Sequence, residues 1–175
     1  TLVRILGWRG HEEGLKQILA AAESEDSGTR LAGLAAIGDL PAVEGFDRLI
    51  EALNTTDEAQ LKVVIEAFDG LKGEQITGKL IDAYREADSS QLKSSLLHIL
   101  GRRPCEAVRD VLFEAAEDSE PQVRRAALTA LGRCDEPRAT ELLLDFAGGE
   151  DGPAAVGAVD GLLIQLDRAR TRGDD

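Results

Sequence analysis

The large apolar residues recur along the chain at a fixed spacing. Adjacent aliphatic pairs return every 31 residues, five times without drift. These pairs are Ile18–Leu19, Leu49–Ile50, Leu80–Ile81, Val111–Leu112 and Leu142–Leu143. A constant period of this length indicates tandem repeats, each forming one supersecondary unit.

Two further markers keep the same period. The acidic residues Asp26, Asp57 and Asp88 are 31 residues apart, and Asp118 and Glu150 follow with slips of one residue. An apolar residue followed by glycine occurs at Leu6-Gly7, Ile37-Gly38, Leu100-Gly101 and Leu131-Gly132, with Phe68-Asp69-Gly70 one step late. We expect the acids to cap the N-terminus of a second helix in each unit and the glycines to cap its C-terminus.

Each unit carries two stretches with the apolar i, i+3, i+7 spacing of one helical face. The spacing and the caps predict ten helices, at about 11–22, 27–38, 42–53, 57–69, 73–86, 89–101, 105–117, 120–132, 137–147 and 152–170. Residues 1–6 match the end of an eleventh helix, and residues 171–175 are expected to be a disordered tail.

Such helix pairs cannot bury both their faces alone, so stacking on neighbours is required. The sequence therefore predicts an all-α fold, an α–α superhelix of about five hairpins with a partial N-terminal helix, in a single domain over residues 1–170. The expected repeat units are 11–38, 41–69, 73–101, 104–132 and 136–170. Because the chain has no methionine and starts within a helical pattern, we expect it to be a fragment of a longer protein.

The unit from Asp118 to Gly132 resembles the HEAT-like repeat of phycobilisome (bilin) lyases, whose pattern is D-x-x-x-x-V-R-x-x-A-x-x-A-L-G. The resemblance covers almost the whole chain more loosely, and it implies a right-handed HEAT-like solenoid. It also implies an inter-repeat ladder of an acid and the basic residue six positions later, here Asp118 and Arg124. In the other units Arg30 and Lys93 take the place of Arg124, whereas Leu61 and Ala155 depart from the pattern.

The composition limits the classes of partner that we expect. The formal net charge is −13, which repels a phosphate backbone, so we expect no nucleic-acid partner. No apolar run reaches about 18 residues, so no membrane span is expected, and a cytoplasmic location is the simplest assignment. Cys105 and Cys134 lie in successive loops about 8–10 Å apart, too far for a disulfide and too few for a metal site, so reduced thiols are expected.

The residues for catalysis are sparse. The chain has two histidines, one tyrosine and one tryptophan. His98 has no neighbouring nucleophile, and the single His11-Glu12 pair does not reproduce the repeated His-Glu pairs of HEAT-like di-iron hydroxylases. We therefore expect no catalytic residue, metal or cofactor, and a non-catalytic role. The alternative implied by the resemblance is a bilin-lyase-like chromophore-handling protein or lyase subunit.

The variable polar positions of the second helices are expected to line a concave groove. The candidate binding residues on it are Arg102, Arg125, Arg133, His98, Thr129, Glu66 and Trp8. The arginines form a basic patch suited to a protein or an acidic peptide, because guanidinium groups pair with carboxylates. Alternatively they neutralise adjacent acids or helix C-termini, and Trp8 is covered by an upstream repeat. The predicted function is a protein- or peptide-binding scaffold of undetermined oligomeric state.

Overall fold

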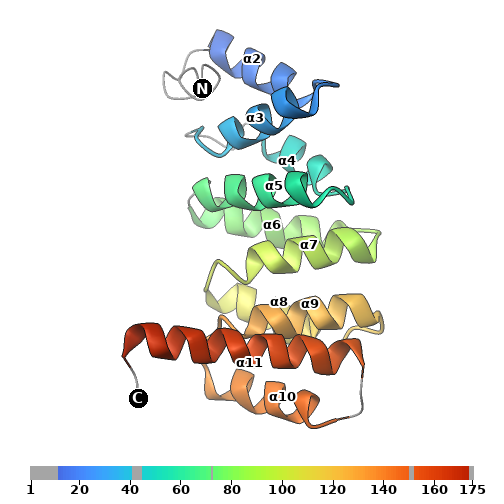
Figure 1. Ribbon diagram of the computed structural model, residues 1–175, viewed down its shortest axis with the longest axis vertical. Helices are drawn as coiled ribbons and strands as arrows, with labels where there is room; N and C mark the ends of the chain where they lie inside the picture. Colours follow the sequence, from blue (N-terminus) through green and yellow to red (C-terminus); the bar gives the residue numbers. More distant parts are fainter. Residues whose placement is uncertain (1–11, 41–44, 72, 150–151, 174–175) are drawn as a thin grey trace. The chain divides into compact units, whose positions relative to one another are not determined.

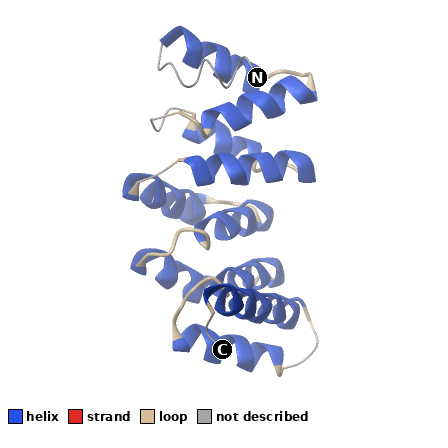
Figure 2. Cartoon of the chain, turned by 60° about the vertical axis from the view of Figure 1, so that its left-hand side comes forward, coloured by secondary structure: helices blue, strands red, loops and turns tan. Residues whose placement is uncertain are grey.

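A computed structural model describes residues 12–40, 45–71, 73–149 and 152–173. Within these ranges all regular secondary structure is helical (Figure 2). The helices are α2 Glu12–Ala22, α3 Ser27–Ile37, α4 Phe46–Ala52, α5 Glu58–Gly70, α6 Glu74–Glu86, α7 Ser90–Leu100, α8 Glu106–Ala115, α9 Pro121–Leu131, α10 Pro137–Ala147 and α11 Pro153–Arg172. The predicted fold class, an α–α solenoid of helical hairpins, is confirmed; the handedness of a superhelix stays a prediction.

The helix boundaries agree with the sequence prediction to within one residue except at the start of α4 and at the ends of α8 and α11. The described part of α4 starts at Phe46, after Gly45, whose φ of 89° is left-handed and favours glycine. Helix α11 continues through Thr171 and Arg172, which corrects the prediction that the tail is disordered from residue 171. It does so because Arg172 bonds Asp135 of a neighbouring turn. Trp8 and the helix end predicted over residues 1–6 lie outside the described residues.

The chain divides into two compact units, residues 1–76 and residues 77–175. The single domain expected over residues 1–170 stays a prediction. In a repeat array each hairpin contacts only its neighbours, so there is no common central core, and one repeat pattern can form more than one compact unit. In the first unit α3 packs against α2, α4 and α5. In the second unit α9 packs against α7, α8 and α11, and α11 also packs on α10 (Figure 1).

The periodic glycines allow close helix contacts in the second unit. Gly101 and Gly132 are the C-cap residues of α7 and α9, as predicted, and both have a right-handed φ of −59°. A Cβ on Gly101 would lie 2.7 Å from the Cβ of Ala130, and one on Gly132 would lie 2.6 Å from the Cα of Gly161. These distances are below van der Waals contact, so the glycines are needed for the close approach of α7, α9 and α11.

The same arrangement occurs in the first unit. A Cβ on Gly38 would lie 2.6 Å from the Cα of Ala67, in the neighbouring second helix α5. The core around this contact includes Phe46 and Phe68, whose rings meet edge to face with centroids 5.7 Å apart. Both units therefore join their second helices through small residues.

The predicted acidic N-caps hold for two helices. Asp26 accepts a hydrogen bond from the backbone N–H of Thr29 at 2.8 Å, and Asp57 accepts one from Ala59 at 2.9 Å. For α7 the cap is Ser89 and not Asp88, because the Ser89 hydroxyl reaches the N–H of Leu92. For α9 the prediction is wrong: the N-cap residue Glu120 makes no side-chain cap bond.

The expected ladder between an acid and an arginine takes a different form. Arg124 donates from Nη1 to the carbonyl oxygens of Asp118 and Ser119, at 2.8 and 3.1 Å, and not to the Asp118 carboxylate. Arg30 does the same with Ser24 and Glu25. The arginine at this position therefore closes the loop that precedes its own helix.

Candidate functional site

Five of the predicted binding residues lie in the second unit, on α7, α9 and the turns after them. His98 and Arg102 are exposed, and Arg125 is exposed on α9, which packs against α7. Thr129 is half-buried, and its hydroxyl lies 3.3 Å from the carbonyl oxygen of Gly157 on α11. Arg133 is half-buried just after α9. Four of these side chains are thus basic groups carried by adjacent second helices and their terminal turns.

Arg125 forms an ion pair with an acid of the next helix. Its Nη2 lies 3.7 Å from Oδ2 of Asp160, and the two side chains are 52% and 43% exposed. The arginine therefore does neutralise an adjacent acid, as the alternative interpretation of the patch expected. An exposed pair of this kind contributes only about 0–1 kcal/mol, so a ligand carboxylate can replace Asp160 at little cost.

A denser group of arginines surrounds the turn between α9 and α10. Arg168 donates from Nη1 to the carbonyl oxygen of Arg133 and from Nη2 to Asp135 at 3.2 Å. Arg172 donates from Nη2 to the other carboxylate oxygen of Asp135 at 2.7 Å. We call Arg133, Arg168 and Arg172 the arginine cluster. Two guanidinium groups, of Arg168 and Arg172, meet the carboxylate of Asp135, and Arg168 also bonds the backbone of Arg133.

The central carboxylate of the cluster stays ionised. The hydrogen bond from Arg172 lowers the pKa of Asp135 below its usual value, and the charges of Arg168 and Arg172 act in the same direction. Asp135 is therefore a fixed acceptor that holds two arginine side chains side by side. A second carboxylate at this position would meet the same donors.

Arg168 and Arg172 were not predicted as members of the patch. Their i, i+4 spacing places both on one face of a helix, but the helix was expected to end at residue 170. With the helix extended by two residues, this spacing would have predicted that Arg168 and Arg172 lie side by side. Of the two remaining predicted residues, Glu66 is exposed on α5 of the first unit, and Trp8 lies outside the described residues.

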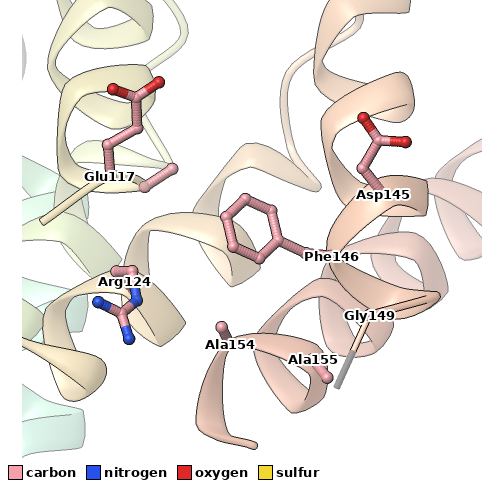
Figure 3. Close-up of a pocket in the computed structure, with 8 residues that line it drawn as sticks. Glu117, Arg124, Asp145, Phe146, Gly149, Ala154 and Ala155 are labelled. Atoms are coloured by element: carbon pink, nitrogen blue, oxygen red, sulfur yellow. The ribbon is translucent and has the colours of Figure 1, made fainter. Parts of the chain in front are cut away.

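A pocket lies at the other end of α9. Its volume is about 560 Å³. It is lined by Ala116, Glu117, Arg124, Asp145, Phe146, Gly149, Ala154 and Ala155. Figure 3 shows Phe146 projecting from α10 toward the side of the pocket that carries Arg124.

The repeat pattern explains why this space is open. Ala155 stands one period after Arg124, where a long side chain in two other units fills the corner and bonds the preceding loop. Alanine reaches neither the space nor the loop carbonyls, and Gly149 adds no side chain. The departure of Ala155 from the repeat pattern was visible in the sequence, although it was not connected with a cavity.

The pocket offers an aromatic ring, two carboxylates and one guanidinium group, which suits a side chain of a bound peptide. Nucleophilic chemistry has no candidate there among the lining residues. In the described ranges no group of three histidines, cysteines or acids is placed to hold a metal ion. None of the helices described is both long and apolar enough to cross a bilayer.

The cysteines are free, as the sequence predicted. Cys134 is buried beside the arginine cluster, and burial raises the pKa of its thiol. Cys105 is exposed at the N-cap of α8. The buried thiol is therefore protonated near neutral pH and unreactive in the folded chain.

Comparison with known protein families gives one match. Residues 77–162 match the family model of HEAT repeats. This stretch starts near the beginning of the second unit and reaches into α11, so it includes α7, α8, α9 and α10. No curated protein matches the chain. The match concerns HEAT repeats in general, and the resemblance to the bilin-lyase type stays a prediction.

Proposed function

We propose that this HEAT-like repeat protein is a non-catalytic scaffold that binds an acidic segment of a partner protein on its second unit. The observation that carries the proposal is the arginine cluster, in which Asp135 is shared by Arg168 and Arg172 next to Arg133. Arg102 and Arg125, on the neighbouring second helices, extend the basic surface.

The chemistry of the cluster favours carboxylates. A guanidinium group is always charged at physiological pH and presents a planar fork of N–H donors that matches a carboxylate. Charge-assisted hydrogen bonds of this type are about twice as strong as neutral ones. Because the chain as a whole carries −13, an acidic segment approaches most easily where arginines are concentrated.

The rigidity of the surface supports recognition. The glycine contacts hold α7, α9 and α11 at short distances, so Arg125, Arg168 and Arg172 are carried by packed helices. Arg102 and Arg133 follow α7 and α9 within two residues. The pocket near Arg124 lies about 14 Å along α9 from Arg133, at 1.5 Å per residue. An extended peptide of a few residues spans that distance, so one segment can contact both regions.

The test is the affinity of a labelled peptide with alternating glutamates, measured by fluorescence anisotropy at moderate salt. The matched peptide carries glutamine at every glutamate position. We expect Arg168→Gln/Arg172→Gln to weaken binding of the glutamate peptide by about tenfold, because two charge-assisted contacts are lost. The control variant Lys16→Gln/Arg85→Gln removes the same number of positive charges at exposed sites elsewhere and is expected to change the affinity little.

A variant of opposite sign makes the test sharper. Asp135→Asn removes the internal carboxylate that competes for both arginines, so the glutamate peptide is expected to bind about threefold tighter. Equal binding of the glutamate and glutamine peptides would contradict the proposal. So would equal losses in the cluster variant and in the control.

A further inference from the structure

The pocket at the N-terminal end of α11 lies where the last repeat lacks an arginine. In the first unit Arg30 donates from Nη1 to the carbonyl oxygens of Ser24 and Glu25, at 2.8 and 3.2 Å. Arg124 makes the same two kinds of bond in the second unit. Ala155 stands one period after Arg124 and carries only a methyl group. The corner that an arginine fills in two repeats is therefore open in the last one.

The backbone position that accepts from the arginine is part of the pocket wall. Arg124 bonds the carbonyl oxygen of Asp118, which stands six residues before it. Gly149 stands six residues before Ala155 and lines the pocket. The last repeat therefore keeps the position of the acceptor, although its own side chain at residue 155 brings no donor.

The acids around the corner are also kept. Glu117 and Asp145 line the pocket, and the residues one period before them are the acids Glu86 and Glu114. In the described part of the second unit, neither pocket carboxylate takes part in an ion pair. Two carboxylates at the mouth of one pocket attract a positive group.

The ring of Phe146 offers a surface for the flat face of a guanidinium group. In Figure 3 this ring lies between Glu117 and Asp145. The chain already contains such a contact, because the guanidinium carbon of Arg138 lies 4.1 Å from the centre of the Phe113 ring. A guanidinium group can stack on a ring and donate from its edge at the same time, whereas the ammonium group of a lysine is a compact point charge.

The guanidinium group of Arg124 also lines the pocket, and it does not exclude a second cation there. Its Nη1 is held on the carbonyl oxygens of its own loop. Lys93 precedes Arg124 by one period, so the array already carries basic residues at this position in two successive second helices, which pack on each other. An acidic occupant would face the two carboxylates, and an apolar one would remove them from water without a partner.

We propose that this pocket binds an arginine side chain of a partner protein. The guanidinium group stacks on Phe146 and pairs with Glu117 and Asp145. Its aliphatic stem lies over Ala154 and Ala155, so the partner supplies the side chain that the last repeat lacks. The pocket takes the opposite charge to the arginine cluster, and the binding of arginine in it does not depend on the binding of an acidic segment at the cluster.

The probe is blocked arginine, N-acetyl-arginine methylamide, titrated into the isotopically labelled full chain and followed by amide-resolved NMR. Two matched probes are blocked citrulline, which has nearly the same shape without the charge, and blocked lysine. We expect saturable shifts at Phe146, Gly149 and Ala155 with the arginine probe, and affinities at least about fivefold lower for the other two probes. Equal affinity for the citrulline probe or for the lysine probe would overturn the proposal.

Charge variants separate the pocket from the general acidity of the chain. Glu117→Gln/Asp145→Asn removes both pocket carboxylates. The control Asp110→Asn/Glu141→Gln removes the same two types of acid at exposed positions of α8 and α10 outside the pocket. We expect the pocket variant to weaken binding of the arginine probe by about fivefold or more and the control to change it little. Equal losses in the two variants would contradict the proposal.

Filling the pocket from within the chain gives a second readout. Ala155→Arg restores the arginine of the repeat, so it is expected to abolish saturable binding of the arginine probe. It is also expected to raise the thermal midpoint above that of Ala155→Gln, which adds a long neutral side chain. Circular dichroism measures both midpoints and checks that each variant is folded. Undiminished binding of the probe by Ala155→Arg, or a lower midpoint for Ala155→Arg than for Ala155→Gln, would show that the pocket does not accept a guanidinium group.

Discussion

The contact between α9 and α11 can be tested at a single glycine. Changing Gly132 to alanine would place a Cβ 2.6 Å from the Cα of Gly161, whereas carbon atoms in contact are usually about 3.5–4.0 Å apart. The two helices would have to separate by about 1 Å. Inserting a methyl into a packed interface costs about 1–3 kcal/mol, and the φ of −59° at Gly132 is compatible with alanine.

The change in backbone freedom affects the stability in the opposite direction to the clash. Replacing glycine by alanine at a compatible φ stabilises a protein by about 0.4–1 kcal/mol, because the unfolded chain loses freedom. The net expectation for Gly132→Ala is a destabilisation of about 1–1.5 kcal/mol. Gly78 in α6 is the matched control, because a Cβ there meets nothing within 4 Å. Gly78→Ala is therefore expected to stabilise the chain by about 0.5–1 kcal/mol.

Urea unfolding followed by circular dichroism measures both effects. The midpoint is expected to fall for Gly132→Ala and to rise for Gly78→Ala, with thermal midpoints moving by about 2–4 °C per kcal/mol. If Gly132→Ala raised the midpoint as Gly78→Ala does, α9 and α11 would not approach as closely as described. The role assigned to the periodic glycines would then be wrong.

Three further predictions concern the cap, the loop arginine and the thiols. Asp26→Ala is expected to lower the thermal midpoint at pH 7, because the cap of α3 is lost. The hydrogen bond from Thr29 lowers the pKa of Asp26, so the cap stabilises the chain only while Asp26 is ionised. The difference in thermal midpoint between the variant and the wild type should therefore shrink as the pH falls below 3.8 through the lowered pKa. Arg124→Ala is expected to lower the free energy of unfolding in urea by about 1–2 kcal/mol, because it removes two hydrogen bonds to loop carbonyls. Arg125→Ala, at the exposed neighbouring position, should lower it by less than about 1 kcal/mol. Iodoacetamide is expected to modify Cys105 in the folded chain and the buried Cys134 only after unfolding. Mass spectrometry of the two cysteine peptides measures both rates of modification. Equal rates for the two cysteines in the folded chain would contradict the burial of Cys134.

The sequence predicted the helices well because their signals are local. Apolar spacing, acidic caps and prolines at helix starts all act within one or two turns, so α9 and α10 begin at Pro121 and Pro137 as such signals imply. The periodic glycines were predicted as C-caps, and Gly38, Gly101 and Gly132 occupy that position. Their close contact with the next helix was not predicted, because both roles give the same pattern of one glycine per unit and only the neighbouring helix reveals the contact.

The candidate site was predictable only in part. Arg102, Arg125 and Arg133 follow from the register of the second helices, which the period provides. Arg168 and Arg172 join Arg133 through contacts with residues more than 30 positions away, and no local pattern encodes such contacts. The pocket could not be predicted from a local pattern either, because it results from the small side chain of Ala155 combined with a neighbouring loop.

Binding of an acidic segment at the arginine cluster can be located residue by residue in an amide-resolved NMR titration. The glutamate peptide is titrated into isotopically labelled full-length chain, and the saturable shifts are mapped onto the sequence. We expect the largest shifts in the turn that holds Arg133 and Asp135 and in the last turns of α11 around Arg168 and Arg172. Saturable shifts confined to other helices, or no saturable shifts with the glutamate peptide, would contradict it.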